Sequence, residues 1–207
     1  MSESDDPELQ EMIETIREAL AQFRGYADYW KWPLDRQLEE RGVAEALSAY
    51  LIHAENADLV SFGSVKHDPP DVLLKSAAGK RIGVEVTELI DSDAAARHRF
   101  RKKRGEAQPY DWADWNAQRM SAEIIQTILR KDCKLSAHAS DYDELYLAIC
   151  TAEPMIDLAL AQQAMSLISV DVKRIDRAFL LLSYHPALDE NVYPGKIAIL
   201  PIPLDKK

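Results

Sequence analysis

Hydrophobic residues recur at helical spacing in the first quarter of the chain. Residues 7–24 predict one amphipathic helix, because an apolar residue returns every three or four positions. Its apolar positions are Leu9, Met12, Ile13, Ile16, Leu20 and Phe23. Residues 34–54 predict a second helix, and Pro33 suits the first turn of that helix. We therefore expect residues 1–33 to form a helical extension ahead of the main body.

Short apolar runs bounded by turn residues follow, and they predict strands. The first is DLVSFGSV at 58–65. DVLLKS at 71–76 and RIGVEVTEL at 81–89 flank a glycine turn and predict a hairpin. Residues 91–113 are mostly polar and predict a long basic insertion loop. Loops of this length in a compact domain are usually functional or mobile.

Helices and buried strands alternate through the second half of the chain. Helical spacing returns at 114–135 and at 155–169. The runs ELYLAIC (144–150), RAFLLLSY (177–184) and KIAILPI (196–202) predict strands, the first two being covered on both faces. A hairpin followed by alternating helices and strands predicts an α/β fold with a mixed sheet and helices on both faces.

Length and composition fit one folded domain. The chain has 207 residues, of which 47% are hydrophobic and 29% are charged. Residues 34–151 would form its core, and the helix and strands of residues 152–207 would complete the sheet. No apolar run is long enough to span a bilayer, and the acidic start is unlike a targeting peptide. We therefore expect a cytoplasmic protein.

The glycine turn selects the register of the hairpin. A three-residue loop that ends at Gly79 pairs Asp71 with Glu85, whereas a two- or four-residue loop pairs Asp71 with Val86. The second register would place Glu85 on the apolar face with Val72, and such a slip moves every side chain of the strand to the other face. We therefore predict the first register, with the two carboxylates side by side and their Cβ atoms about 5 Å apart.

Two adjacent carboxylates repel each other and call for a cation. At neutral pH both stay ionised only if a cation lies between them, and otherwise the pKa of one rises strongly. A Mg²⁺ ion suits such a pair, because it takes one or two carboxylates together with waters and a substrate phosphate. The alternative is an ordinary polar pair, in which Glu85 contacts Arg81 or Lys75 on the same face.

Around these residues the sequence resembles the restriction-endonuclease-like superfamily, the PD-(D/E)xK nucleases. The motif is matched by Pro70 and Asp71, then a hairpin, then GVEVT at 83–87. The preceding helix, the following helix and the strand DELYLAIC come in the order of the αβββαβ core of that family. The resemblance covers about residues 34–151. It implies a three-layer α/β/α sandwich on a mixed central sheet.

The resemblance also implies roles for particular residues. Asp71, Glu85 and the backbone carbonyl of Val86 match the positions that hold Mg²⁺ (or Mn²⁺) in the family. A lysine two residues after the glutamate normally helps to position or deprotonate the attacking water. Thr87 stands at that position here, and it brings neither charge nor useful basicity.

Some relatives of this superfamily supply the missing cation from a neighbouring element. The candidates are Lys131 and Lys134 on the helix that follows the insertion, together with Lys75 on the hairpin. Glu45, on the helix that precedes the sheet, is a candidate for a further acid at the site. For each of these residues the alternative is an ordinary solvated side chain.

The charge distribution adds a candidate nucleic-acid contact. The net charge is −10, which counts against binding of a polyanion by the whole surface. The segment RHRFRKKR nevertheless holds six of the 25 lysines and arginines and no acid. These six are Arg97, Arg99, Arg101, Lys102, Lys103 and Arg104. The segment is either a contact to a phosphate backbone or a solvated loop.

Other chemistries have little support in the sequence. There is no GxGxxG, GxxxxGK[ST] or GxSxG motif, the five histidines are scattered, and the two cysteines have no zinc spacing. The expected activity is metal-assisted hydrolysis of phosphodiester bonds in DNA or RNA. The alternative is a catalytically inactive module of the same fold that binds nucleic acid or protein. The sequence leaves open DNA or RNA, and monomer or homodimer.

Overall fold

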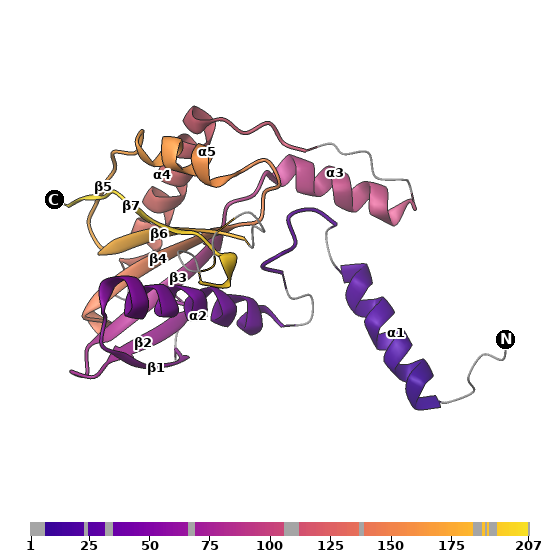
Figure 1. Cartoon of the computed structure of the whole chain (residues 1–207), viewed down its shortest axis with the longest axis horizontal. Coiled ribbons are helices and arrows are strands. Elements are labelled where there is room, and N and C mark those ends of the chain that lie inside the picture. Colours follow the sequence, from indigo (N-terminus) through magenta and orange to yellow (C-terminus); the bar gives the residue numbers. More distant parts are fainter. Residues whose placement is uncertain are drawn as a thin grey trace.

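The computed structural model describes residues 7–22, 25–31, 35–65, 69–105, 112–136, 139–183, 188, 190 and 194–206. Within these residues the fold is mixed α/β, with one six-stranded mixed sheet and five α-helices (Figure 1). None of the described helices has the length and apolar composition needed to cross a membrane.

The main sheet has the strand order β1-β2-β3-β4-β6-β7. Its strands are β1 (Leu59–Ser64), β2 (Val72–Ser76), β3 (Arg81–Glu88), β4 (Glu144–Thr151), β6 (Arg177–Leu182) and β7 (Ile199–Ile202). The pairs β3–β4 and β4–β6 are parallel, and the other three pairs are antiparallel. The mixed sheet predicted from the order of elements is therefore confirmed. A small parallel pair, β5 (Asp171–Val172) with β8 (Asp205–Lys206), was not predicted.

Most helices begin at a side chain that accepts hydrogen bonds from backbone N–H groups in the first turn. The helices are α1 (Pro7–Gln22), α2 (Arg36–Glu55), α3 (Ser92–Lys103), α4 (Ala117–Leu135) and α5 (Leu158–Met165). Asp35, Asp91, Asn116 and Asp157 cap α2, α3, α4 and α5, respectively. Figure 1 shows α1 standing apart from the sheet.

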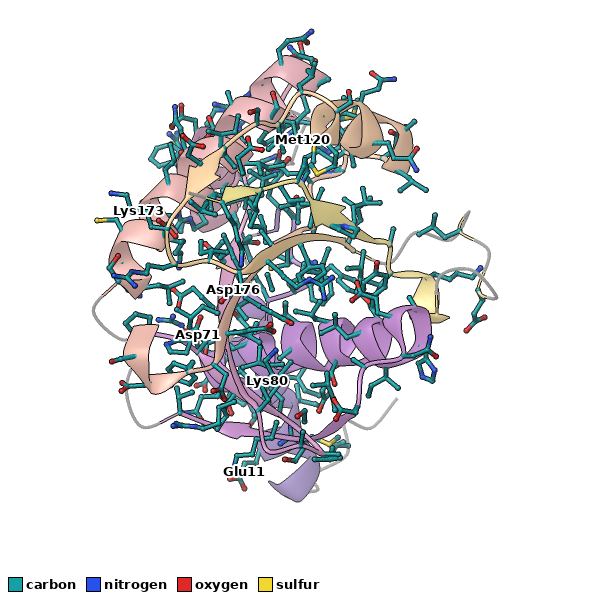
Figure 2. The ribbon with its side chains drawn as sticks, turned by 90° about the vertical axis from the view of Figure 1, so that its left-hand side faces the viewer. Glu11, Asp71, Lys80, Met120, Lys173 and Asp176 are labelled. Carbon is teal, nitrogen blue, oxygen red and sulfur yellow. The ribbon has the colours of Figure 1, made fainter. Side chains whose placement is uncertain are left out.

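The sheet separates two hydrophobic clusters. On one side, Leu47 and Leu51 of α2 pack with Val84 of β3 and Phe179 of β6. On the other side, α4 and α5 pack against the opposite faces of β4 and β6. Figure 2 shows the side chains of both clusters, with Met120 of α4 labelled. The strands β4 and β6 are thus buried on both faces, as their continuous apolar sequences predicted.

The hairpin has the predicted register. Val72 lies opposite Val84, and the Ser76 N–H donates to the Lys80 carbonyl at 3.1 Å. Gly79 has φ +84°, a conformation that suits glycine, and this closes the loop. The two core-facing valines and the two acids therefore lie on the faces to which the alternating pattern assigned them.

The prediction of a loop at residues 91–113 is wrong for most of its described part, because α3 occupies Ser92–Lys103. Asp91 Oδ1 accepts from the Ala94 N–H at 2.6 Å, and Gly105 follows the helix with φ +65°. Ala94 and His98 are buried against Tyr26. Residues 106–111 of the expected loop lie outside the described residues.

Candidate active site

The candidate site lies where Asp71 enters β2 and Glu85 stands in β3. The Asp71 N–H donates to the Val84 carbonyl at 3.0 Å, and Asp71 Oδ2 accepts from the Val86 N–H at 2.7 Å. Glu85 is 1% exposed and lies between the flanking strands β2 and β4. The cross-strand pairing thus brings the two carboxyl groups to the same part of the sheet.

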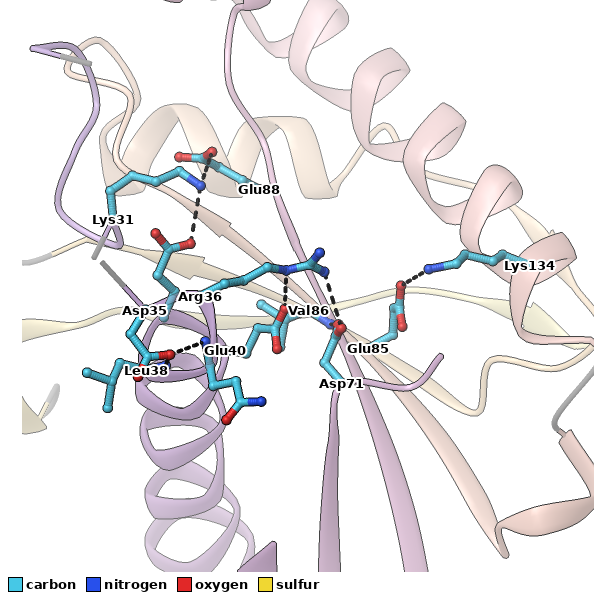
Figure 3. Close-up of polar contacts among 12 residues, drawn as sticks. Lys31, Asp35, Arg36, Leu38, Glu40, Asp71, Glu85, Val86, Glu88 and Lys134 are labelled. Carbon is cyan, nitrogen blue, oxygen red and sulfur yellow. Dashed lines mark hydrogen bonds and ion pairs between the residues drawn. The ribbon is translucent and has the colours of Figure 1, made fainter. Parts of the chain in front are cut away.

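Three cations from two helices reach these carboxyl groups. Lys131 of α4 places its Nζ 2.6 Å from Glu85 Oε1, and Lys134 Nζ lies 3.4 Å from the same oxygen. From the other side, Arg36 in the first turn of α2 places Nη2 3.5 Å from Asp71 Oδ1. Figure 3 shows Arg36 reaching toward Asp71, and Lys134 toward Glu85. The carboxylate pair is therefore bracketed by α2 and α4.

These cations do not fully offset the burial of the two carboxyl groups. Burial raises the pKa of Asp71 to about 7, and the charges of Glu85 and Glu40 act in the same direction. The Val86 N–H and Lys131 oppose that rise. Glu85 Oε2 is buried and has no hydrogen-bond partner among the described residues. A buried carboxylate oxygen without a partner is costly, and so this oxygen is a ready ligand for a cation.

Asp132, the neighbour of Lys131 in α4, anchors the end of that helix. Both carboxylate oxygens of Asp132 accept backbone N–H groups of the segment before β6: Oδ2 from Lys173 at 3.1 Å, and Oδ1 from Arg174 at 2.8 Å and Ile175 at 2.9 Å. These bonds fix the last turns of α4 against the sheet. Lys131, which is 8% exposed, is thereby held toward Glu85.

The structure does not bring every predicted residue to the site. Glu45 is half exposed and pairs with Arg41 at 3.1 Å on the outer side of α2. Thr87 is half-buried, and its carbonyl accepts from Cys150 Sγ at 3.5 Å. Lys75 is exposed. Of the three candidate lysines, Lys131 and Lys134 therefore reach the carboxylates, and Lys131 makes the shorter contact.

Two residues near the carboxylates were missed by sequence reasoning. Arg36 contacts Asp71, and Glu40 pairs with Arg36 at 2.5 Å. Both lie in the first two turns of α2, some thirty residues before Asp71. The helical spacing of i and i+4 indicates that they share a face, but no local signal says which strand that face meets.

The six cations of the basic segment lie on α3 or directly after it. Arg101 and Lys102 are half-buried, and the other four are exposed. In Figure 1, α3 follows the carboxyl end of β3, the end nearer to Glu85, and extends away from the sheet. Trp115, which follows that segment, packs under the guanidinium of Arg119, whose Cζ lies 4.3 Å from the ring centroid.

The donor set fits a hard divalent cation. Among the described residues, no group of three or more His, Cys, Asp or Glu side chains is arranged to hold a metal. Mg²⁺ does not need such a group, because it keeps several waters and commonly takes one or two carboxylates. Asp71 and Glu85 would supply these two, and the unpartnered Glu85 Oε2 is the oxygen best placed to do so.

A pocket of about 240 Å³ adjoins the carboxylate pair. It shares Arg36 with the Asp71 contact and Lys131 with the Glu85 contact. Its lining residues are Trp30, Lys31, Arg36, Glu39, Glu40, Val43, Val86, Thr87, Glu88, Lys131 and Cys150. Lys31 lies 3.3 Å from Glu39 and 3.5 Å from Glu88, so this wall carries its own ion pairs (Figure 3).

Another buried acid, Glu153, lies just after β4. Its Oε2 accepts from the Tyr26 hydroxyl at 2.5 Å, and its Oε1 accepts from the Asp91 N–H at 2.6 Å. Asp91 in turn pairs with Arg119 of α4. This cluster joins the segment at residues 25–31 to the start of α3 and the first turn of α4, and both oxygens of its central carboxylate are satisfied.

Comparisons with known proteins found neither a matching family model nor a matching curated protein. Two solved structures are similar to this chain. SfsA from Pyrococcus furiosus in complex with Ca²⁺ has 16% identity and a TM-score of 0.31 over 81% of this chain and 66% of that one. A protein of unknown function from Pseudomonas aeruginosa, described as monooxygenase superfamily, has 15% identity and a TM-score of 0.38 over 93% and 92%. Both TM-scores are too low to carry an inference about this chain.

Proposed function

We propose that this protein is a divalent-metal-dependent phosphodiesterase of nucleic acids, with the three-layer α/β/α architecture of the restriction-endonuclease-like family. The observation that carries the proposal is the buried pair of Asp71 and Glu85, with the ammonium group of Lys131 2.6 Å from Glu85. The three groups that the chemistry requires are two carboxylates and one cation. Here they come from the residue before β2, from β3 and from α4.

Asp71, Glu85 and the Val86 carbonyl would hold the metal. When bound, the metal would polarise a phosphoryl oxygen and lower the pKa of the attacking water. Because Asp71 has a pKa of about 7 in the metal-free protein, a bound divalent cation would return this carboxyl group to its ionised form. Arg36, next to Asp71, would be available to contact the phosphate of the substrate.

Lys131 would take the role that Thr87 does not fill. A lysine at position 87 would approach the carboxylates along β3, whereas Lys131 approaches Glu85 from α4. In either case an ammonium group lies beside the metal-binding glutamate. It would orient the attacking water and stabilise the negative charge that develops during hydrolysis. The basic segment of α3 would contact the phosphate backbone outside the reacting bond.

A second candidate function follows from the same contact. Lys131 already gives Glu85 a positive partner, and Thr87 stands where the motif has lysine. In a catalytically inactive module this ion pair would replace the metal, and the protein would act by binding nucleic acid or a protein partner. Metal binding at Asp71 and Glu85 separates the two functions.

The test combines cleavage with metal binding. Purified protein is incubated with single- and double-stranded DNA and RNA in Mg²⁺ or Mn²⁺, and its melting temperature is measured as the metal is titrated. We expect cleavage and a rise in melting temperature, because a ligand that binds only the folded state stabilises it. Asp71→Asn and Glu85→Gln should abolish the rise and lower cleavage at least about a hundredfold.

The matched control is Glu123→Gln, which removes one exposed carboxylate from α4 about two turns before Lys131. This variant should keep both the metal response and the cleavage rate. If the melting temperature does not change when metal is added and no substrate is cleaved, the nuclease proposal is overturned and the inactive module is favoured.

A further inference from the structure

The pocket beside the carboxylate pair differs in charge from a phosphate site. Three cations line it, namely Lys31, Arg36 and Lys131, and three acids face them, namely Glu39, Glu40 and Glu88. A site that holds a phosphate dianion needs an excess of positive charge or backbone N–H groups. The balanced lining of this pocket suits a neutral group that has both donors and acceptors on its edges.

The remaining walls are aromatic or apolar. Trp30 lines the pocket while its Nε1 donates to the Thr151 carbonyl at 3.2 Å, so the position of the indole is fixed. Val43, Val86 and Cys150 supply apolar surface. A planar ring with polar edges matches this combination, because nucleobases stack on aromatic side chains and bond to charged side chains along their edges.

The size and position of the pocket further limit which group can bind in it. At about 240 Å³, the pocket is smaller than the clefts of roughly 300–1,000 Å³ that take drug-sized ligands, so it has room for one ring system. It shares Arg36 and Lys131 with the carboxylate pair. A group bound there would therefore lie next to a phosphate held at Asp71 and Glu85.

We propose that this pocket receives one unstacked base of the substrate, next to the phosphate that is cleaved. The inference rests on the proposed function, and it specifies the substrate as single-stranded or locally opened nucleic acid. Glu39 and Glu88 accept hydrogen bonds from the edge of the base, Lys31 donates to it, and Trp30 lies against the ring. A base inside an intact duplex is stacked and paired, so it reaches the pocket only by leaving the stack.

The test varies the substrate. Wild-type protein is given a single-stranded DNA, an abasic strand of the same length with identical phosphodiester links, and the corresponding duplex. A single-stranded RNA and its duplex form a parallel arm. We expect kcat/KM for the natural strand to exceed that for the abasic strand by about tenfold or more, which is the range of one base–aromatic stack. The duplex should be cleaved more slowly than the single strand in each arm.

Pocket variants test whether this preference arises in the pocket. Trp30→Leu removes the aromatic ring and keeps apolar bulk, and Glu88→Gln keeps the shape and removes the charge. Both should bring the ratio of natural to abasic cleavage toward one, whereas the control Glu123→Gln should keep it. Because both rates are measured on the same preparation of a variant, their ratio does not depend on the amount of folded protein. Equal cleavage of natural and abasic strands by the wild type overturns the inference and leaves the nuclease proposal standing.

Failure of the nuclease proposal gives a different result. If no strand is cleaved, binding of the natural and abasic strands to the wild-type protein is compared by fluorescence anisotropy in the absence of metal. Tighter binding of the natural strand, lost in Trp30→Leu, supports a base pocket in a protein that binds without cleaving. Equal binding of both strands, or binding of neither, overturns the pocket as well.

Discussion

Two buried acids, Glu85 in β3 and Glu153 just after β4, have opposite surroundings. Glu153 is 3% exposed, and each of its oxygens accepts a hydrogen bond, one from the Tyr26 hydroxyl and one from the Asp91 N–H. Glu85 is 1% exposed, with one oxygen paired to Lys131 and the other without a partner among the described residues.

The difference separates an acid that joins several elements from an acid that keeps one oxygen without a hydrogen-bond partner among the described residues. A fully bonded carboxylate such as Glu153 stabilises the contacts among its neighbours and has little capacity left for a ligand. Glu85 is placed beside a second buried carboxylate, Asp71, whose pKa is raised to about 7. A buried acid with a strongly raised pKa, such as Asp71, is typical of functional sites. Substitutions at these acids and at their partners test this division.

Replacing Lys131 tests the Glu85 side of the comparison most directly. Lys131→Met removes the ammonium group 2.6 Å from Glu85 and keeps the length of the side chain. We expect cleavage of single-stranded DNA to fall by about a hundredfold or more, the usual cost of losing a group that stabilises the charge developing in the transition state. The control is Arg130→Met on the exposed face of α4, which should retain its activity. Unchanged cleavage by Lys131→Met would remove this lysine from the mechanism.

Replacing Glu153 should affect stability and leave the chemistry intact. Glu153→Ala leaves the Tyr26 hydroxyl and the Asp91 N–H without their acceptor. Since hydrogen bonds to a charged group contribute about 1.5–3 kcal/mol each, we expect the free energy of unfolding in urea to fall by about 3 kcal/mol. The rate of cleavage per folded molecule should stay within about twofold of wild type, because the hydrogen-bond partners of Glu153 are Tyr26 and Asp91 and include neither Asp71 nor Glu85. A large loss of rate in folded protein would show that the two acids are not separable.

Restoring the motif lysine sharpens the assignment of Lys131. In the Lys131→Met background, Thr87→Lys places an ammonium group two residues after Glu85, on the same face of β3. We expect it to recover about tenfold of the lost cleavage rate, a coupling within the usual range for residues that share one partner. The same substitution in the wild-type background should bring no such gain. Equal effects in both backgrounds would mean that positions 87 and 131 do not share a role.

The last prediction concerns the dependence of stability on pH. Burial and Glu85 raise the pKa of Asp71 from 3.8 to about 7, so between these values the folded metal-free protein binds a proton that the unfolded chain has released. Its stability should therefore fall as pH rises through this window, with a slope of at most about 1.4 kcal/mol per pH unit for one proton. Urea unfolding in EDTA measures the slope, and Asp71→Asn should reduce it. A slope of opposite sign, unchanged in that variant, would contradict the raised pKa.

The hairpin was predictable because its signals are local. Gly79 and the alternation of Val72, Val84 and Glu85 are within about 15 residues of one another, and together they permit one register. The mixed sheet followed from the order of elements in the same way. The helix α3 was missed because its buried residues are two alanines and a histidine, which give no apolar stripe, although the Asp91 cap, the absence of Gly and Pro and the final Gly105 indicate a helix.

The cations of the site depend on contacts that are distant in the sequence. Helical spacing permits both Lys131 and Lys134 to face the sheet, and only the packing of α4 shows that Lys131 makes the shorter contact with Glu85. The two-residue strands β5 and β8 have no local pattern at all. Glu45 could have been excluded from the helix itself, because it stands on the face opposite the buried Val43 and Leu47.

The three amide hydrogen bonds of Asp132 tie the ammonium group of Lys131 to a segment that takes no part in the site. The backbone amides of Lys173, Arg174 and Ile175 exchange with solvent only when they leave the Asp132 carboxylate. When they leave, the last turns of α4 lose their anchor, and the neighbouring lysine can move away from Glu85. The rate of deuterium uptake at these three amides would therefore report how often the contact between Lys131 and Glu85 opens, even though the amides lie outside the site.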